Sequence, residues 1–349
     1  MPEVAQARLS TQRLVGEPFA TPVEAVGRLL AVQSQDYAGA KWALGLRTPT
    51  TEAELDRLFD AGAILRTHVL RPTWHFVLPA DIGWLLELTA PRVKAQLASF
   101  DRRAGVDAEM LRGSRRALEA ALADGQPRTR AELSKALGVA GQAAGHLLMH
   151  GELEGLLVSG PRQGLQHTHR LLDAPARRLS REEALAELTL RYFTGHGPAQ
   201  VQDCAWWSGL TIADIRRGLD LVGTALVAED IGGKRYWQAP DAPAARVPPH
   251  TVHLLPNYDE YVVAYRDRSA ALDPARGVDL APFPMGSILA HTVLLDGQVW
   301  GGWKRRQAGR EVVVELGALD VMGPEDSAAL QGAAERLGRF LQRPVRLST

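Results

Sequence analysis

The chain contains 349 residues, which is too long for one small hydrophobic core and favours roughly two to four compact units. Lysine plus arginine equals aspartate plus glutamate, at 40 each, so no global field attracts nucleic acid or a membrane, and any polyanion must be bound by local groups. The single cysteine, Cys204, excludes an internal disulfide. The sequence has no apolar signal segment and no run of about 20 apolar residues, so we expect a cytoplasmic protein.

The first well-specified helix begins at Thr21-Pro22-Val23-Glu24, which combines an N-cap threonine, a proline at the first helical position and a glutamate three residues after the cap. Continuing its helical period puts Gln33 on the apolar face. An unpaired buried amide costs roughly 1–3 kcal/mol. Gln33 therefore either bonds to a neighbouring backbone or lines a cavity that opens to a ligand, and the sequence leaves both possibilities open.

Gln35 adds a second amide two residues later. In a continuous helix, residues two apart point about 200° away from each other. Both amides can converge on one ligand only if the helix ends or distorts between them.

The next segments predict helices followed by a hairpin. We expect helices over 37–46 and from a capping box at Thr51 to about residue 61, then strands over 64–70 and 73–77. This order is typical of a winged helix, a helix-turn-helix variant with a β wing. Arg66 and His68 share one strand face, Thr73 and His75 share another, and this polar alternation indicates a solvated surface. Two helices, over 81–88 and 92–103, follow.

The pattern returns twice. The second copy has helices over 109–123, from a capping box at Thr129 to Gly138, and over 141–154, with wing strands over 156–158 and 165–172. Residues 162–178 hold four arginines and two histidines against one acid, which indicates either a local DNA contact or a solvated hairpin. The third copy has a capping box at Ser180, helices over 198–207 and 211–219, and strands over 225–229 and 235–238.

After a proline-rich linker over 240–249, the period changes to two. We expect strands over 251–255, 288–295, 298–303 and 311–316, and a final helix over 324–341. The fold class is therefore α+β, with units over 1–104, 105–179, 180–245 and 246–349.

Other patterns that suggest chemistry are weak. His146 and His150 are four residues apart but lack a zincin glutamate, so we expect no metal. Cys204 has no nucleophile signature, and no glycine-rich phosphate loop is present, so we expect no cofactor.

The chain resembles the AlkZ/YcaQ-type winged-helix DNA glycosylases. The matching segments are Val32-Gln33-Ser34-Gln35-Asp36, Leu65-Arg66-Thr67-His68-Val69-Leu70-Arg71-Pro72-Thr73-Trp74-His75, Leu254-Leu255-Pro256-Asn257-Tyr258-Asp259-Glu260-Tyr261 and Tyr265-Arg266-Asp267-Arg268. That family has tandem winged helices and a β-rich unit around a concave DNA-binding channel. Its catalytic motif is Gln-x-Gln, or Gln-x-Asp in the YcaQ branch, with a middle residue that is usually aliphatic and here is Ser34.

The resemblance implies a monofunctional glycosylase that excises cationic N-alkylated purines, bulky or crosslinked lesions among them, from duplex DNA. Gln33 and Gln35 would be catalytic, Asp36 accessory, and the protein a monomer associated with the nucleoid. The expected DNA contacts are Arg66, His68, Arg71, Thr73, His75, Arg162, His167, His169, Arg170 and Tyr258. The alternative is a non-catalytic winged-helix DNA-binding protein or transcription regulator. Regulators of this type dimerise on paired half-sites, whereas three such units in one chain can cover a duplex alone, which favours repair.

Overall fold

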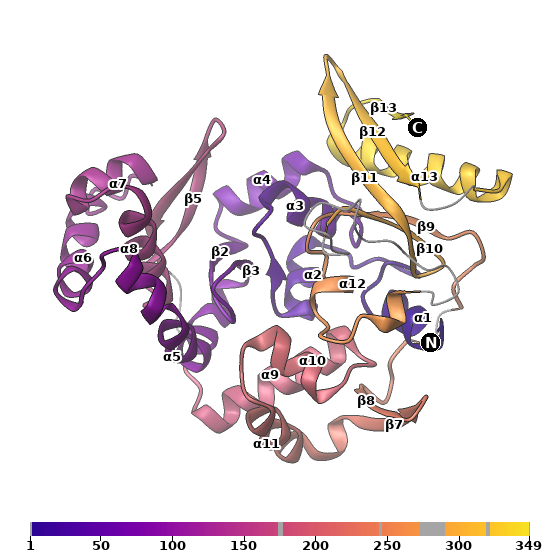
Figure 1. Cartoon of the computed structure of the whole chain (residues 1–349), viewed down its shortest axis with the longest axis horizontal. Coiled ribbons are helices and arrows are strands. Elements are labelled where there is room, and N and C mark those ends of the chain that lie inside the picture. Colours follow the sequence, from indigo (N-terminus) through magenta and orange to yellow (C-terminus); the bar gives the residue numbers. More distant parts are fainter. Residues whose placement is uncertain (1, 174–176, 244–245, 273–289, 319–321, 349) are drawn as a thin grey trace.

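The computed structural model describes residues 2–173, 177–243, 246–272, 290–318 and 322–348. Helices alternate with short antiparallel sheets along the first two thirds of the chain, and a five-stranded sheet with a covering helix closes the C-terminal third (Figure 1). Ile288 and Leu289, at the start of one expected strand, lie outside the described residues. Within the ranges given, no helix combines the length and apolar character needed to cross a bilayer.

The first unit supplies the strand that carries the glutamines. Its elements are α1 (Pro2–Thr11), α2 (Pro22–Leu29), β1 (Val32–Gln33), α3 (Tyr37–Gly45), α4 (Glu52–Asp60), β2 (Leu65–His68), β3 (Trp74–Val77) and α5 (Pro79–Arg103). Thr21 caps α2 as predicted, because its hydroxyl accepts the Glu24 N–H at 3.1 Å. The helix then ends, since Leu30 has φ of 64°. Gln33 therefore lies on a strand, and its predicted place on the helical stripe is wrong.

Helix α5 also departs from the prediction of two helices, because it runs unbroken for 25 residues through Pro91. A proline removes one intrahelical hydrogen bond and disfavours helix continuation. Here apolar side chains are buried on both sides of it, among them Trp84, Leu88, Val93 and Leu97. Packing on both halves holds the helix together across the proline.

The second and third units repeat the arrangement of helices and a hairpin. The second consists of α6 (Ala108–Ala121), β4 (Arg128–Thr129), α7 (Arg130–Leu137), α8 (Gly141–Leu153), β5 (Leu157–Gln163) and β6 (Gln166–Leu171). The third consists of α9 (Arg181–His196), α10 (Val201–Ser208), α11 (Ile212–Val222), η1 (Gly223–Ala225), β7 (Val227–Ile231) and β8 (Lys234–Gln238). At Thr51, Thr129 and Ser180, the cap side chain accepts the backbone N–H of the glutamate three residues later, and that glutamate accepts the backbone N–H of the cap residue. These three predicted capping boxes are therefore confirmed.

The C-terminal sheet has the strand order β13-β12-β11-β10-β9, antiparallel except for the parallel β12–β13 pair. The described elements of this C-terminal part of the chain are β9 (Val252–Leu255), α12 (Glu260–Val263), η2 (Ser269–Ala271), β10 (Thr292–Leu295), β11 (Gln298–Ala308), β12 (Glu311–Ala318), α13 (Pro324–Leu341) and β13 (Val345–Ser348). The long β11–β12 and β5–β6 hairpins project on the same side of the view, with α3 and α4 between them (Figure 1).

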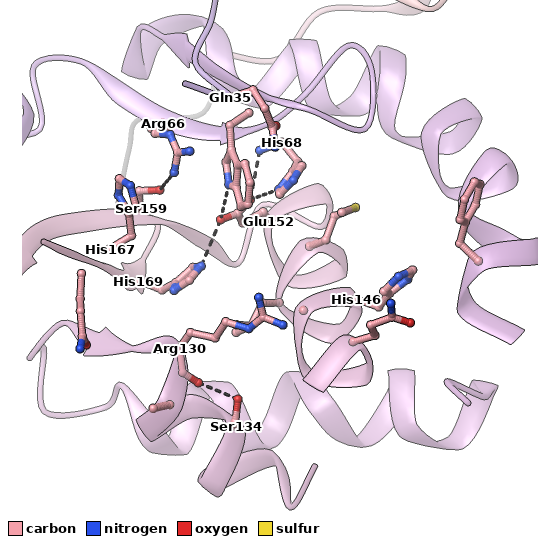
Figure 2. A pocket seen from close by; sticks show the side chains of 18 of the residues that line it. Gln35, Arg66, His68, Arg130, Ser134, His146, Glu152, Ser159, His167 and His169 are labelled. Carbon is pink, nitrogen blue, oxygen red and sulfur yellow. Dashed lines mark hydrogen bonds and ion pairs between the residues drawn. The ribbon is translucent and has the colours of Figure 1, made fainter. Parts of the chain in front are cut away.

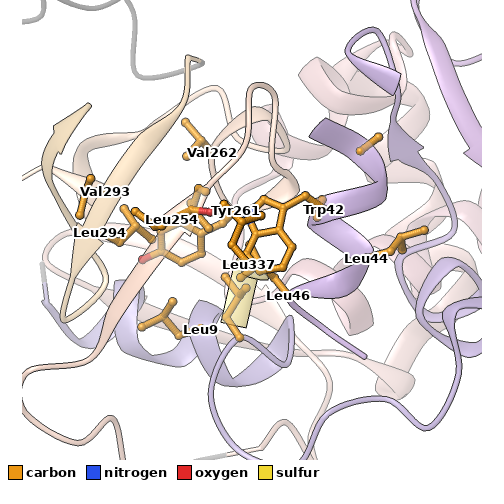
Figure 3. Close-up of a cluster of buried hydrophobic side chains, with 14 of the residues drawn as sticks. Leu9, Trp42, Leu44, Leu46, Leu254, Tyr261, Val262, Val293, Leu294 and Leu337 are labelled. Atoms are coloured by element: carbon orange, nitrogen blue, oxygen red, sulfur yellow. Dashed lines mark hydrogen bonds between the residues drawn. The ribbon is translucent and has the colours of Figure 1, made fainter. Parts of the chain in front are cut away.

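One hydrophobic core joins the two ends of the chain. Trp42 of α3 packs on Phe340 of α13 with ring centroids 5.2 Å apart, and its indole N–H donates to the Leu254 carbonyl at 2.7 Å. Figure 3 shows Trp42 with Tyr261 and Leu337 in this core. Arg47 and Asp259, both buried, form a bidentate pair at 2.7 and 2.9 Å nearby. These contacts fix the segment that follows β9 against the first unit, next to β1.

Candidate active site

The glutamine strand lies at one edge of a three-stranded sheet of order β1-β3-β2. Gln33 pairs with His75, which pairs with Thr67, so these residues form one row across the sheet and share one face. Arg66, His68 and Trp74 alternate to the other face. The two faces of this small sheet therefore carry two different sets of polar side chains.

The face of Arg66, His68 and Trp74 opens into a cavity of about 1150 Å³ between the first and second units (Figure 2). Gln35, which is exposed, lines it beyond the end of β1. The remaining polar lining residues are Arg103, Arg130, Ser134, Gln142, His146, Glu152, Ser159, Gln166, His167 and His169. Gln33 is not among the lining residues, so this cavity is not the cleft that both glutamines were predicted to share.

Glu152 of α8 is the fully buried acceptor at the cavity wall. Its carboxylate bonds the ring nitrogen Nδ1 and the backbone N–H of His68, the latter at 3.1 Å, and lies 3.4 Å from Nε2 of His169 (Figure 2). The indole N–H of Trp74 approaches it at 3.5 Å. Burial opposes the charged form, but the His68 imidazole and the bonds from both histidines hold the pKa of Glu152 well below its usual range.

Arg66 links the cavity to the glutamine segment. Its guanidinium donates to the Ser34 carbonyl at 3.1 and 3.2 Å and to the Ser159 hydroxyl at 3.3 Å, and it lies 4.4 Å from the Trp74 ring centroid. Burial lowers the pKa of Arg66 to about 10, while Glu152 works in the opposite direction. Arg66 thus stays a cation at neutral pH and anchors the backbone between the two glutamines.

Gln33, on the opposite face, is held from two directions. Its backbone N–H donates to Glu260 Oε1 at 2.7 Å, and its side-chain Oε1 accepts from Arg71 Nη2 at 3.3 Å. Thr67, Arg71, Thr73 and His75 around it each carry a buried polar atom without a hydrogen-bond partner among the described residues. Such a concentration of unpaired groups is unusual in a protein interior.

His75 was expected to contact DNA, but it is completely buried, so it has no surface for a DNA strand to meet, and this prediction is corrected. Its Nδ1 bonds the Thr73 carbonyl at 3.0 Å. Burial, followed by the nearby Arg71 cation, lowers the pKa of His75 to about 3. The ring is neutral at pH 7, and its unpaired Nε2 is then a bare acceptor.

The other predicted residues divide between the cavity and the surface near it. His167 and His169 of β6 line the cavity, as do Arg66 and His68. Asp36 is the N-cap of α3, since it accepts the Gly39 N–H at 3.0 Å, and it also accepts from Asn257 at 3.1 Å. Three further predicted residues are half-buried. The guanidinium of Arg162 lies 5.4 Å from the Tyr37 ring, and Arg170 packs over Gly62. Tyr258 lies in the turn after β9.

No group of three metal-ligating side chains gathers within the residues that the structure describes. His146 and His150 both bond the carboxylate of Asp101, at 2.6 and 3.0 Å. Cys204 is buried and unpaired with another cysteine.

The family model described as DNA glycosylase AlkZ-like matches residues 26–340. The chain belongs to the AlkZ-like DNA glycosylase family. Among solved structures, the Streptomyces sahachiroi DNA glycosylase AlkZ is similar over 99% of each chain, with a TM-score of 0.78 and 23% sequence identity, which shows a shared fold. No curated protein matches the chain. Family membership supports DNA as the substrate class and DNA repair as the setting.

Sequence reasoning missed Glu152 and Glu260, the two buried carboxylates that organise the two faces of the sheet. Glu152 is 84 residues from His68, and Glu260 is 227 residues from Gln33, so no local spacing links either pair. Two signals were available: Glu260 stands in the segment over 254–261 that matches the family, and Glu152 is a charged residue in a helical stretch that contains Leu147 and Leu148.

Proposed function

We propose that this protein is a monofunctional DNA glycosylase that hydrolyses the bond between deoxyribose and a cationic N-alkylated purine in duplex DNA. The observation that carries the proposal is the exposed Gln35 in the wall of a cavity of about 1150 Å³, in a chain of the AlkZ-like DNA glycosylase family. Bulky adducts and interstrand crosslinks fall within the same chemistry when they alkylate a purine ring nitrogen.

The chemistry needs little from the enzyme. A purine alkylated at a ring nitrogen is already positive, so its glycosidic bond breaks without protonation of the leaving group. The carbonyl oxygen of Gln35 orients a water molecule and places partial negative charge against the oxocarbenium-like sugar. The water oxygen bonds to C1′, the glycosidic electron pair neutralises the purine, and one water proton passes to solvent.

Gln33 is the second amide of the proposed catalytic pair, acting from the opposite face of the sheet. Arg71 and Glu260 fix its side chain and its backbone, so it is presented in one orientation. Asp36 is the N-cap of α3, directly after Gln35, and takes an accessory role in catalysis.

No lysine occurs among the described residues that line the cavity. Strand cleavage by a bifunctional glycosylase requires an amine that forms a Schiff base with the sugar. We therefore infer base release that leaves an intact strand with an abasic site.

For DNA binding we propose that residues 1–104, 105–179 and 180–245 act as tandem winged-helix units that, with the β-rich unit 246–349, form a concave channel for a duplex. Arg162, Arg170, His167 and His169 on the second hairpin supply local cations and donors, and Tyr258 contributes from the β-rich unit. Three units in one chain allow binding as a monomer.

The test is incubation of the protein with a duplex that carries one N7-methylguanine, followed by alkaline cleavage of abasic sites. We expect cleavage at the lesion only after alkali, and none in a matched duplex that carries uracil, because neutral amides supply no leaving-group protonation. DNA binding without abasic sites would instead support the alternative of a non-catalytic DNA-binding regulator.

A further inference from the structure

Trp206 of α10 is an exposed aromatic residue with a specific setting. Its side chain is 41% exposed, which is high for tryptophan, although its indole N–H donates to the Val263 carbonyl at 3.2 Å. The guanidinium carbons of Arg71 and Arg268 each lie 5.5 Å from the centroid of its ring. Two cations from distant parts of the chain thus meet at one exposed indole.

Neither arginine is paired with a carboxylate of the described residues. Among the described residues, no carboxylate oxygen lies within 4 Å of Arg71 or Arg268, and each has a buried N–H without a partner, Nε in Arg71 and Nη2 in Arg268. Glu260 attracts Arg71, but its own oxygens accept the N–H groups of Gln33 and Trp207. Burial lowers the pKa of both arginines, although Glu260 attracts Arg71 and Asp203 attracts Arg268.

The position of this group connects it to the glutamine strand, because Arg71 also donates to the side chain of Gln33. The group therefore lies on the Gln33 face of the small sheet, away from the cavity that Gln35 lines.

We propose that Trp206, Arg71 and Arg268 bind one strand of the DNA, with the indole against a nucleotide and the two guanidiniums on its flanking phosphates. Arginine and aromatic side chains bind nucleic acid strands in this combination. A phosphate supplies both arginines with the anionic partner that the described residues do not place within 4 Å of them. The strand then crosses the end of β1, with Gln35 on one side and Gln33 on the other. This inference rests on the proposed function, since it takes DNA as the ligand.

A matched pair elsewhere in the third unit provides the control. Trp237 of β8 is half-buried and has Arg235 at 5.9 Å from its ring, but Arg235 lies 3.5 Å from a carboxylate oxygen of Asp230. Both sites contain an arginine close to a tryptophan ring. At Trp237 the arginine is paired with a carboxylate, whereas at Trp206 one of the two arginines donates to Gln33.

The experiment measures affinity for an undamaged duplex by fluorescence anisotropy at several salt concentrations, for wild type, Trp206→Ala, Trp206→Phe, Arg268→Gln and Trp237→Ala. We expect Trp206→Ala to weaken binding about tenfold and Trp206→Phe to restore most of it, because the ring and not the indole N–H contacts the nucleotide. Arg268→Gln should reduce the slope of log affinity against log salt by about one. Trp237→Ala should bind like wild type.

Equal affinities for Trp206→Ala and Trp237→Ala, or an unchanged salt slope in Arg268→Gln, would overturn the inference. Excision of N7-methylguanine by wild type and by the same Trp206→Ala protein shows whether the contact site alone is wrong or the proposed function is wrong as well. If wild type binds the duplex and excises the base while Trp206→Ala does both equally well, only this contact site is wrong. If wild type binds no DNA, both proposals fail.

Discussion

Glu260 accepts the backbone N–H of Gln33 at 2.7 Å, although 227 positions of sequence separate the two residues. The other carboxylate oxygen accepts the Trp207 indole N–H at 2.9 Å and lies 3.4 Å from Nε2 of His196. Glu260 is completely buried, so its bonds hold β1, the third unit and the β-rich unit in one fixed arrangement. The orientation of the glutamine strand therefore depends on a residue of the C-terminal third of the chain.

This relationship predicts the effect of Glu260→Ala. Loss of the carboxylate frees the β1 backbone, so excision should slow more than DNA binding weakens, because binding surfaces elsewhere remain. Single-turnover rates and anisotropy titrations on the same lesion duplex measure the two effects. Glu260→Gln, which keeps one oxygen acceptor for Gln33, should recover part of the rate, and failure to do so would assign Glu260 to stability alone.

Glu152→Gln tests the carboxylate at the cavity wall. The change removes the buried carboxylate that bonds His68 and His169, so the free energy of unfolding should fall by about 3 kcal/mol. Denaturant unfolding measured at pH 7 provides the value. Glu154→Gln is the control, since this neighbouring residue pairs with the solvent-accessible Lys94 and Arg115 and should change stability by less than about 1 kcal/mol. Similar losses in the two variants would contradict the role of Glu152.

His75 predicts a pH dependence of stability. Its pKa is about 3 in the folded protein against 6.5 as the reference, so the unfolded chain binds a proton that the folded one does not. Protonation of His75 in the unfolded chain therefore does not lower the free energy of unfolding above about pH 6.5. As the pH falls from there toward 3, the free energy of unfolding decreases by about 1.4 kcal/mol per pH unit. His75→Gln should flatten the curve of unfolding free energy against pH between 4 and 6, and a slope equal to that of wild type would show that His75 is protonated when folded.

Charge reversal at the second hairpin tests the DNA-binding surface. Arg162→Glu with Arg170→Glu should lower affinity for a duplex and flatten its salt dependence, because fewer counterions are released. Arg216→Glu, at an exposed position of α11, adds the same charge elsewhere and should have a smaller effect. Equal effects would mean that only net charge matters and that the hairpin makes no specific contact.

Local signals in the sequence predicted much of the fold. Capping boxes at Thr51, Thr129 and Ser180 located three helix starts, because the reciprocal bonds that they describe involve residues only three apart. β1 was missed because it is two residues long and follows a leucine with positive φ, which no apolar period reveals. For this reason the prediction wrongly continued the helix through Gln33.

The candidate site was predictable only in its parts. The resemblance singled out Gln33, Gln35 and a few of the cavity residues, such as Arg66 and His68. It could not place them on two faces of one sheet, since that depends on which strand β1 joins. The burial of His75 and the carboxylates of Glu152 and Glu260 depend on packing between units that lie far apart in the sequence.

The central claim is that neutral amides remove the base. It is tested most directly by single-turnover release of N7-methylguanine from a duplex by wild type, Gln35→Ala and Gln33→Ala, with affinities measured on the same duplex. The account predicts a loss of rate of about 100-fold in Gln35→Ala and a slower rate in Gln33→Ala, with affinity nearly unchanged in both, because the lost interactions matter in the transition state. An unchanged rate in Gln35→Ala, or a loss of affinity equal to the loss of rate, would contradict it.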